Sequence, residues 1–416
     1  MPSRRSSPFA SDSAVSRRAV VAALGAATTA LSGCSAIADD VSVSGPDDPP
    51  KPGVDDLPEP GEHVYGADGE WSSFGCNASN TRTVADGKAP VDGVTERWRA
   101  EVSGFTRREP VVSGGRVYQP VGDRLDVYAA ADGTKLWSKE QVHEPPLVRG
   151  ETAYVGVRNR LLALDPKTGE AKWERTFGRN ASVKSPSTYG GDWLYVPVDE
   201  TVHRIDPKTG ETDWSRRLFG ELLGSPAIFM GHYVALATKA GKLYLLGPDG
   251  TGAAEWNLDS TPRVPPTVDA DRVYVSCLDG NIYGFLPRNE SNGKTDWQVQ
   301  IGWADGGLAV QKYVYAAGTS GLHAIDPRKG ERVWKQDVGD WNLTAPALGR
   351  DTLFVGGDKL YAFDPTPGSN PLTPGPAKRF EKSFHGRVGP GPVLDDGTLY
   401  VVAQTGESAY HLFALE

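Results

Sequence analysis

Short apolar runs separated by turn residues recur through residues 94–416. One run has a central Tyr, as in RVYQPV (116–121), TAYVGV (152–157) and RVYVSC (272–277). A second type, represented by LLALD (161–165), follows it, and a third type carries a Trp. Runs of this length that are bounded by Gly, Pro and Asp are typical of β-strands. The pattern therefore predicts many short strands in place of long helices.

When the repeats are aligned, the third run has an aromatic residue at the same position each time, and these residues recur about every 40 positions. We call this set the Trp column. A repeat of this length built from strands is typical of a β-propeller with four strands in each blade. We expect the aromatic side chains to fill the space between neighbouring blades as structural docking residues. The column consists of Trp98, Trp137, Trp173, Trp214, Trp256, Trp297, Trp334 and Phe380.

The two ends of the repeat predict how the ring closes. The last unit ends at HLFALE (411–416), which matches a third strand, so this unit lacks a fourth. The segment VTERWRAEV (94–102) matches a fourth strand and has no unit before it. We therefore expect an all-β, eight-bladed propeller of four-stranded antiparallel blades, in which this N-terminal strand completes the last blade. Such pairing removes an open sheet edge.

The turn between the third and fourth strands has the sequence Asp-Pro-Lys-Thr-Gly at 165–169 and 206–210. Asp caps the following amides, Pro fixes φ, and Gly allows a positive φ, so this sequence favours a tight turn. With the Ala and Trp around it, the stretch from Ala163 to Trp173 resembles the tryptophan-docking repeat of pyrroloquinoline-quinone (PQQ) propellers. EWSSFGCNASNTR (70–82) also resembles the opening segment of many such proteins. The resemblance covers about residues 70–416.

This resemblance implies one fold and two classes of function. Quinoprotein dehydrogenases of this kind bind PQQ and calcium above an adjacent Cys-Cys pair. BamB-like lipoproteins of the outer-membrane assembly machinery are not enzymes and bind protein partners through loops at one mouth of the ring. The chain has Cys34, Cys76 and Cys277 far apart and no set of acidic and amide residues with calcium-loop spacing. We therefore expect the BamB-like branch, no catalytic residue, no bound metal and no cofactor, with PQQ and calcium as the alternative.

The N-terminal 33 residues have the features of an export signal. Arg17 and Arg18 precede a short apolar run, which is typical of a twin-arginine signal, and Leu31-Ser32-Gly33-Cys34 resembles a lipobox. We expect a lipid anchor on Cys34 and an exported protein held at the outer face of the cell membrane; a Sec signal with a chance Cys is the alternative. Residues 34–69 are acidic and rich in Pro, and we expect a disordered tether. The predicted domains are therefore 1–33, 34–69 and a propeller at 70–416.

Charge and cysteine content exclude other classes. The chain carries 44 Lys and Arg against 53 Asp and Glu, a net charge of −9, which argues against a nucleic-acid partner. No pair of cysteines has the spacing of a zinc site. We expect Cys277 to be a buried thiol, with a disulfide to Cys76 as the alternative.

The connections from each Trp strand to the next unit lie together at one mouth of the predicted ring. They combine aromatic and basic residues, which is the composition of a binding site for a protein partner or an anionic ligand. The alternative is that the aromatics fill the channel and the basic groups pair with acids such as Glu109 and Asp305. A carbohydrate-binding propeller would use the same aromatic mouth. The predicted binding residues are Phe105, Arg107, Arg108, Lys184, Arg263, Trp303, Trp341 and Arg387.

Overall fold

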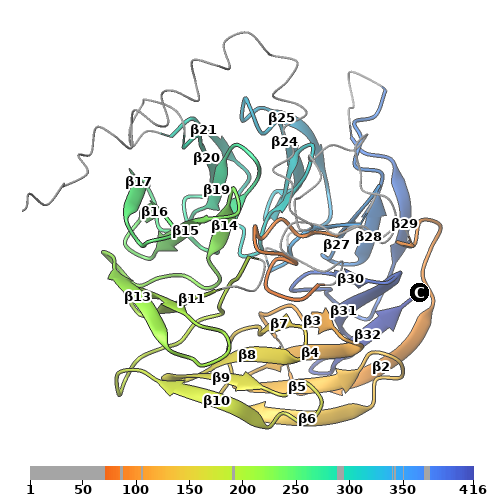
Figure 1. The fold of residues 1–416 in the computed structure, drawn as a ribbon. Helices are drawn as coiled ribbons and strands as arrows, with labels where there is room; N and C mark the ends of the chain where they lie inside the picture. The colour runs from red at the N-terminus through yellow and green to blue at the C-terminus, as the bar shows by residue number, and fades with distance from the viewer. Residues whose placement is uncertain are drawn as a thin grey trace, which may run out of the picture. The chain divides into compact units, whose positions relative to one another are not determined.

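The computed structural model describes residues 71–416 except 85–87, 105, 190–192, 288–294, 340, 342, 350 and 370–374. The described residues form eight sheets, which are the blades of a β-propeller (Figure 1), and all but one of the strand pairs within them are antiparallel. The predicted all-β, eight-bladed fold is therefore confirmed. In this part of the chain, no helical segment has the length and apolarity that crossing a membrane requires.

The blades are numbered here in chain order, with strands running from the ring centre outward. Blade 1 contains β3 (Val111–Ser113), β4 (Arg116–Val121), β5 (Arg124–Ala129) and β6 (Lys135–Glu140). Blade 2 contains β7 (Leu147–Arg149), β8 (Thr152–Val157), β9 (Arg160–Leu164) and β10 (Ala171–Thr176). Blade 3 contains β11 (Leu194–Val198), β12 (Thr201–Ile205) and β13 (Thr212–Arg217). Blade 4 contains β14 (Ala227–Phe229), β15 (Tyr233–Thr238), β16 (Lys242–Leu246) and β17 (Gly252–Asn257).

The second half of the ring repeats this order. Blade 5 contains β18 (Thr267–Val268), β19 (Val273–Ser276), β20 (Asn281–Phe285) and β21 (Trp297–Gln300). Blade 6 contains β22 (Ala309–Val310), β23 (Val314–Gly318), β24 (Gly321–Ile325) and β25 (Arg332–Gln336). Blade 7 contains β26 (Ala347–Gly349), β27 (Thr352–Val355), β28 (Leu360–Phe363) and β29 (Lys378–Lys382), with β1 (Thr83–Val84) added at its inner edge. Blade 8 contains β30 (Val393–Asp395), β31 (Thr398–Gln404), β32 (Tyr410–Leu415) and β2 (Glu96–Val102).

Two blades depart from the regular four-strand pattern. In blade 3 the inner position is filled by an isolated bridge between Ser187 and Tyr195 in place of a full strand. In blade 7, β1 pairs in parallel with β26, so this sheet has five strands.

The N-terminal strand closes the ring as the sequence predicts. β2 pairs antiparallel with β32, with Trp98 opposite Ala414. Beyond the strand ends, the backbone N–H of Thr95 donates to the Glu416 carbonyl at 2.7 Å, and the Glu416 N–H donates back at 2.9 Å. Blade 8 therefore joins the N-terminal part of the propeller to its last residues.

The turns explain the recurring Asp, Gly and Trp. Asp165 Oδ1 accepts the N–H of Lys167 at 2.7 Å, and Gly169 adopts a φ of +73°. The Trp137 indole of the preceding blade packs on this glycine and donates its Nε1–H to the Pro166 carbonyl at 3.0 Å. The same contact to a turn carbonyl of the next blade is made by Trp98, Trp173, Trp214, Trp297 and Trp334.

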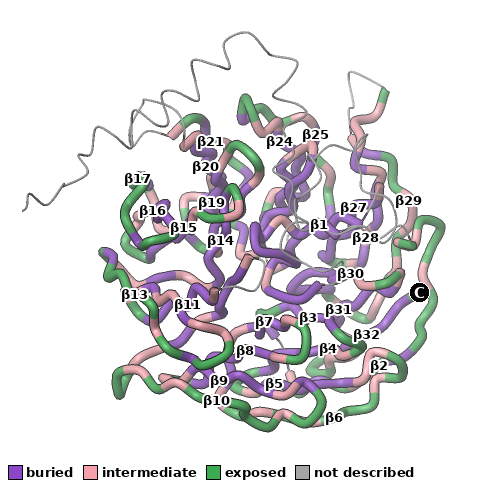
Figure 2. Tube along the Cα trace, viewed as in Figure 1, coloured by how far each residue is buried: buried purple, intermediate pink, exposed green. Residues whose placement is uncertain are grey.

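The hydrophobic core lies between the blades. One cluster combines Tyr118 and Val127 of blade 1 with Val155 and Leu162 of blade 2, and other clusters join other neighbouring blades in the same way. Trp256 and Phe380 belong to two further clusters, the first as a buried and the second as a partly buried member. Burial decreases from the inner to the outer strands, as Figure 2 shows.

Candidate functional site

Residues 71–84 are called the central segment here; they form a ring inside the channel that the inner strands surround. The backbone carbonyls of this segment accept hydrogen bonds from the inner strands of six different blades, at 2.7–3.0 Å. Nearly every residue of the segment is buried. It therefore closes the channel that the inner strands would leave open. The six accepting residues are Trp71, Ser72, Ala78, Ser79, Thr81 and Arg82.

A buried ion pair fixes this central segment. Arg82 is fully buried, and its guanidinium pairs with the carboxylate of Glu109, which comes from the loop before blade 1. The same guanidinium donates to the Pro346 carbonyl at 2.7 Å and lies 5.0 Å from the Trp71 ring centroid. The other Glu109 oxygen accepts the N–H of Gly75 at 3.1 Å. Charge, hydrogen bonds and stacking thus hold the segment to the loops around it.

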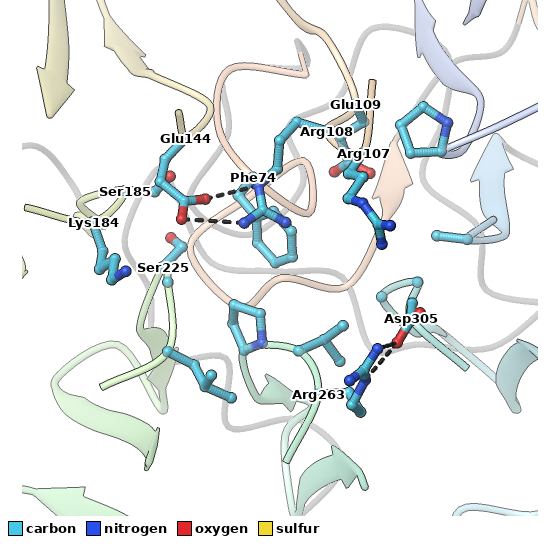
Figure 3. Close-up of a pocket in the computed structure, with 18 of the residues that line it drawn as sticks. Phe74, Arg107, Arg108, Glu109, Glu144, Lys184, Ser185, Ser225, Arg263 and Asp305 are labelled. Atoms are coloured by element: carbon cyan, nitrogen blue, oxygen red, sulfur yellow. Dashed lines mark hydrogen bonds and ion pairs between the residues drawn. The ribbon is translucent and has the colours of Figure 1, made fainter. Parts of the chain in front are cut away.

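One residue of the central segment, Phe74, lines a cavity of about 230 Å³ at the mouth of the ring. The connections between successive blades are called mouth loops here; they are residues 103–110, 141–146, 177–186, 218–226, 258–266, 301–308, 337–346 and 383–392. All eight mouth loops contribute lining residues. Phe74 of the central segment lies among them, with Lys184 and Arg107 on either side (Figure 3). The cavity is therefore the place where all blades meet.

Eight of the twenty residues that line the cavity carry ionic side chains. Arg107, Arg108, Lys184, Lys239 and Arg263 line it, against three acidic residues, Glu109, Glu144 and Asp305.

Specific ion pairs hold most of these cations in place. Arg108 Nε lies 2.9 Å from Glu144 Oε2, and Arg263 pairs with Asp305 (Figure 3). Lys184 and Lys239 both contact the same oxygen, Oε1 of Glu221, at 3.4 and 2.8 Å. Partial burial would raise the pKa of Glu221, but the hydrogen bonds and charges of the two lysines outweigh it and lower that pKa.

The structure separates the predicted binding residues into two groups. Arg107, Arg108, Lys184 and Arg263 come together at the cavity. Trp303 does not line it and is 62% exposed. Trp341 and Arg387 do not line the cavity either. The Arg387 guanidinium lies over the Trp341 ring, 4.3 Å from its centroid. Phe105 and Cys34 lie outside the described residues, as do the predicted signal and tether.

Several site residues were missed in the sequence. Lys239 lies in the hairpin between β15 and β16, and hairpins between second and third strands reach the same face as the mouth loops. The alternation of strand direction was enough to place Lys239 there. Phe74 comes from WSSF (71–74), a segment that belongs to no repeat. Glu221 carries no distinguishing sequence pattern.

Two features of the described residues bear on the alternative of a PQQ and calcium site. These residues contain no group of three or more His, Cys, Asp or Glu side chains placed to hold a metal ion. The cavity is smaller than the roughly 300–1,000 Å³ of pockets that enclose drug-sized ligands.

The two described cysteines, Cys76 and Cys277, are not joined to each other. Cys76 and Cys277 are both buried and neither takes part in a disulfide, so the alternative of a disulfide between them is wrong. Burial raises the pKa of both thiols, that of Cys277 to about 12. Neither is a reactive thiolate at neutral pH.

The fold is shared with solved structures of both expected classes. The quinohemoprotein alcohol dehydrogenase from Comamonas testosteroni superposes with a TM-score of 0.65 at 14% identity, covering 84% of this chain and 80% of that one. BamB from Moraxella catarrhalis gives a TM-score of 0.59 at 17% identity, covering 77% and 97%. The computationally designed Ika8 protein gives 0.58 at 13%, covering 76% and 99%. At these identities the likeness concerns the fold alone.

Sequence comparison assigns the family. A search of curated protein sequences returned no significant match. A family model described as outer membrane protein assembly factor BamB matches residues 91–196, 198–321 and 318–416, which together make up most of the chain. The chain therefore belongs to this BamB family of PQQ-repeat propellers.

Proposed function

We propose that this protein is a membrane-anchored, extracytoplasmic lipoprotein that binds a protein partner through its mouth loops and is not an enzyme. The observation that carries the proposal is the exposure of large aromatic side chains on this face. Phe219 is 69% and Trp303 is 62% exposed, and both belong to mouth loops that also line the cavity. Exposed aromatics beside arginines are typical of residues that dominate the energy of a protein interface.

The anchoring part of the proposal is supported by the N-terminal sequence. Arg17 and Arg18, the apolar run and the lipobox ending at Cys34 stand in the order that export and lipidation require. Mass spectrometry of the mature protein from its native membrane tests this part. We expect an N-terminal Cys34 with added lipid mass; a mature chain that retains Ser32 and Gly33 would contradict it.

Partner binding is tested by crosslinking and affinity capture of the full-length protein from its native membrane. Substituting Phe219→Ala together with Trp303→Ala should reduce capture of the crosslinked partner at least tenfold, because truncating such residues typically costs more than 2 kcal/mol of binding energy. The melting temperature should stay unchanged, since both side chains are exposed. Leu136→Ala is the matched control, because Leu136 is 43% exposed but lies in the outer strand β6. Equal capture by all three proteins would contradict the mouth as the binding face.

The second candidate function is a PQQ-dependent oxidoreductase. The cationic cavity favours it, because PQQ is a carboxylated quinone. The test is absorption spectroscopy of the protein after refolding with PQQ and calcium, followed by dye reduction with alcohols or sugars. We expect neither a bound-quinone spectrum nor turnover; stoichiometric binding with alcohol-dependent dye reduction would replace the proposed function with this one.

A further inference from the structure

The cavity at the mouth has more cationic than acidic side chains. Its lining carries five cations and three carboxylates, and one of these carboxylates, Glu109, is already paired with the buried Arg82. Glu221 lies beside the lining and adds one negative charge. The excess of positive charge is local, because the whole chain has a net charge of −9.

Lys184 and Lys239 are the part of the wall best placed to receive an anion. Each ammonium group has three N–H donors. Both groups point to a single oxygen of Glu221, at 3.4 and 2.8 Å, so one carboxylate serves two cations. A second carboxylate would complete a balanced group of two ammonium and two carboxylate groups. Lys184 comes from the mouth loop before blade 3 and Lys239 from a hairpin of blade 4. The site therefore lies where blades 3 and 4 meet.

Two of the other cations, Arg108 and Arg263, form ion pairs of their own at the cavity wall. Two nitrogens of Arg108 contact both oxygens of Glu144, at 2.9 and 3.2 Å. Two nitrogens of Arg263 contact one oxygen, Oδ1, of Asp305, which comes from another mouth loop. These pairs fix the wall on either side of the lysines. The space of about 230 Å³ that they leave suits a side chain of a partner better than a whole organic cofactor.

We propose that this cavity receives a carboxylate side chain from an acidic peptide segment of the partner. The proposal rests on the proposed function and names the chemistry of its partner. A peptide is favoured over a free anion because the aromatic residues Phe219 and Trp303 are exposed on loops that also line the cavity. Residues that flank the bound carboxylate would therefore meet apolar surface.

The test measures binding of a fluorescein-labelled hexaglutamate peptide to the full chain by fluorescence anisotropy, at 50 and 150 mM salt. We expect saturable binding that weakens with salt, and no binding of a hexaglutamine peptide. Lys184→Gln combined with Lys239→Gln should weaken binding at least tenfold. The matched control is Lys167→Gln with Lys172→Gln, which removes the same charge from the opposite end of a blade. It should change the affinity less than twofold.

Three outcomes would overturn the proposal. Equal losses in the cavity variant and the control would show that the peptide senses only net charge. Displacement of the peptide by citrate, with no effect of Phe219→Ala and Trp303→Ala, would show a site for free carboxylates. Tighter peptide binding after changing Asp47, Asp48, Asp55 and Asp56 to Asn would show that the chain's own acidic segment is the occupant.

Partner capture separates this proposal from the function on which it rests. If the cavity variant loses the peptide but still captures the crosslinked membrane partner, the carboxylate site is wrong and the proposed function stands. If the wild type binds the peptide but captures no partner, the proposed function fails.

Discussion

Among single residues, Arg82 has the most unusual environment. A fully buried guanidinium is costly unless it is paired and hydrogen-bonded, and Arg82 has both kinds of partner. Its partner Glu109 is 5% exposed and also accepts a backbone N–H of the central segment. The pair therefore connects the central segment to the mouth loop that carries Arg107 and Arg108.

Removing both members of this pair should cost less stability than the sum of the two single removals. Arg82→Met and Glu109→Gln should each lower the free energy of unfolding by about 3–5 kcal/mol, because each leaves a buried group without its partner. The double variant should be more stable than the sum of the two single losses predicts. Urea unfolding of the four proteins measures this coupling. Single losses below about 1 kcal/mol that simply add would contradict the role given to the pair.

His323 should make stability depend on pH. It is fully buried, and its Nε2 lies 2.8 Å from Ser320 Oγ. Burial, with smaller effects of the Arg332 and Lys335 charges, lowers the pKa of His323 to about 3. The unfolded chain takes up a proton near pH 6.5, where the folded chain does not, so stability falls as the pH decreases from 6.5.

The slope of this loss is the measurable quantity. Between pH 6 and 4.5, the wild type should lose about 1 kcal/mol per pH unit more than His323→Gln, whose side chain does not titrate. Urea unfolding at several pH values gives both slopes. Parallel curves for the two proteins would mean that His323 is already protonated in the folded state.

At the scale of the repeated element, one turn and one tryptophan connect each blade to the next. A Cβ on Gly169 would lie 2.8 Å from Trp137 Cδ2, at a φ of +73° that favours glycine. The recurring Gly and Trp in the sequence are therefore two halves of one contact between blades. Gly133, Gly210, Gly250 and Gly330 pack on a tryptophan in the same way.

Adding one methyl group to this contact should destabilise the fold. Gly169→Ala should lower the free energy of unfolding by about 2–4 kcal/mol, from left-handed strain and overlap with the indole together. Gly150→Ala should cost only about 1–2 kcal/mol, because Gly150 has a φ of +54° but open space around its Cα. Gly178→Ala, without either constraint, should be nearly neutral. Equal costs at Gly169 and Gly150 would refute the packing contribution.

The sequence predicted the features that repeat and missed those that occur once. Blade number, strand order and ring closure follow from the Trp column and from the unmatched strand around Trp98. The central segment was not predicted as a ring, because it contributes backbone carbonyls, and these leave no side-chain pattern. The sharing of Glu221 by Lys184 and Lys239 also depends on how neighbouring blades meet, which the order of residues within one repeat does not specify.

For the whole molecule, the pairing of β2 with β32 is the only strand pairing that joins the two ends of the described ring into one sheet. Deleting residues 90–103 should leave β32 as an open edge and remove Trp98 from its place between blades 8 and 1. We expect aggregation or loss of cooperative unfolding, measured by size-exclusion chromatography and thermal melting. A stable monomer would contradict closure by this strand.

The central segment and the closing strand near Thr95 also determine when folding can finish. Arg82 contacts the carbonyl of Pro392, 310 residues later, and Thr95 contacts that of Glu416, 321 residues later. Arg82 and Thr95 are thus synthesised early, but these contacts can form only after the last residues of the chain have been synthesised. Contacts of such high sequence separation slow folding, since a very long loop must close before they form. Native structure should therefore appear in one late step, after the C-terminus has left the ribosome, and not blade by blade during synthesis.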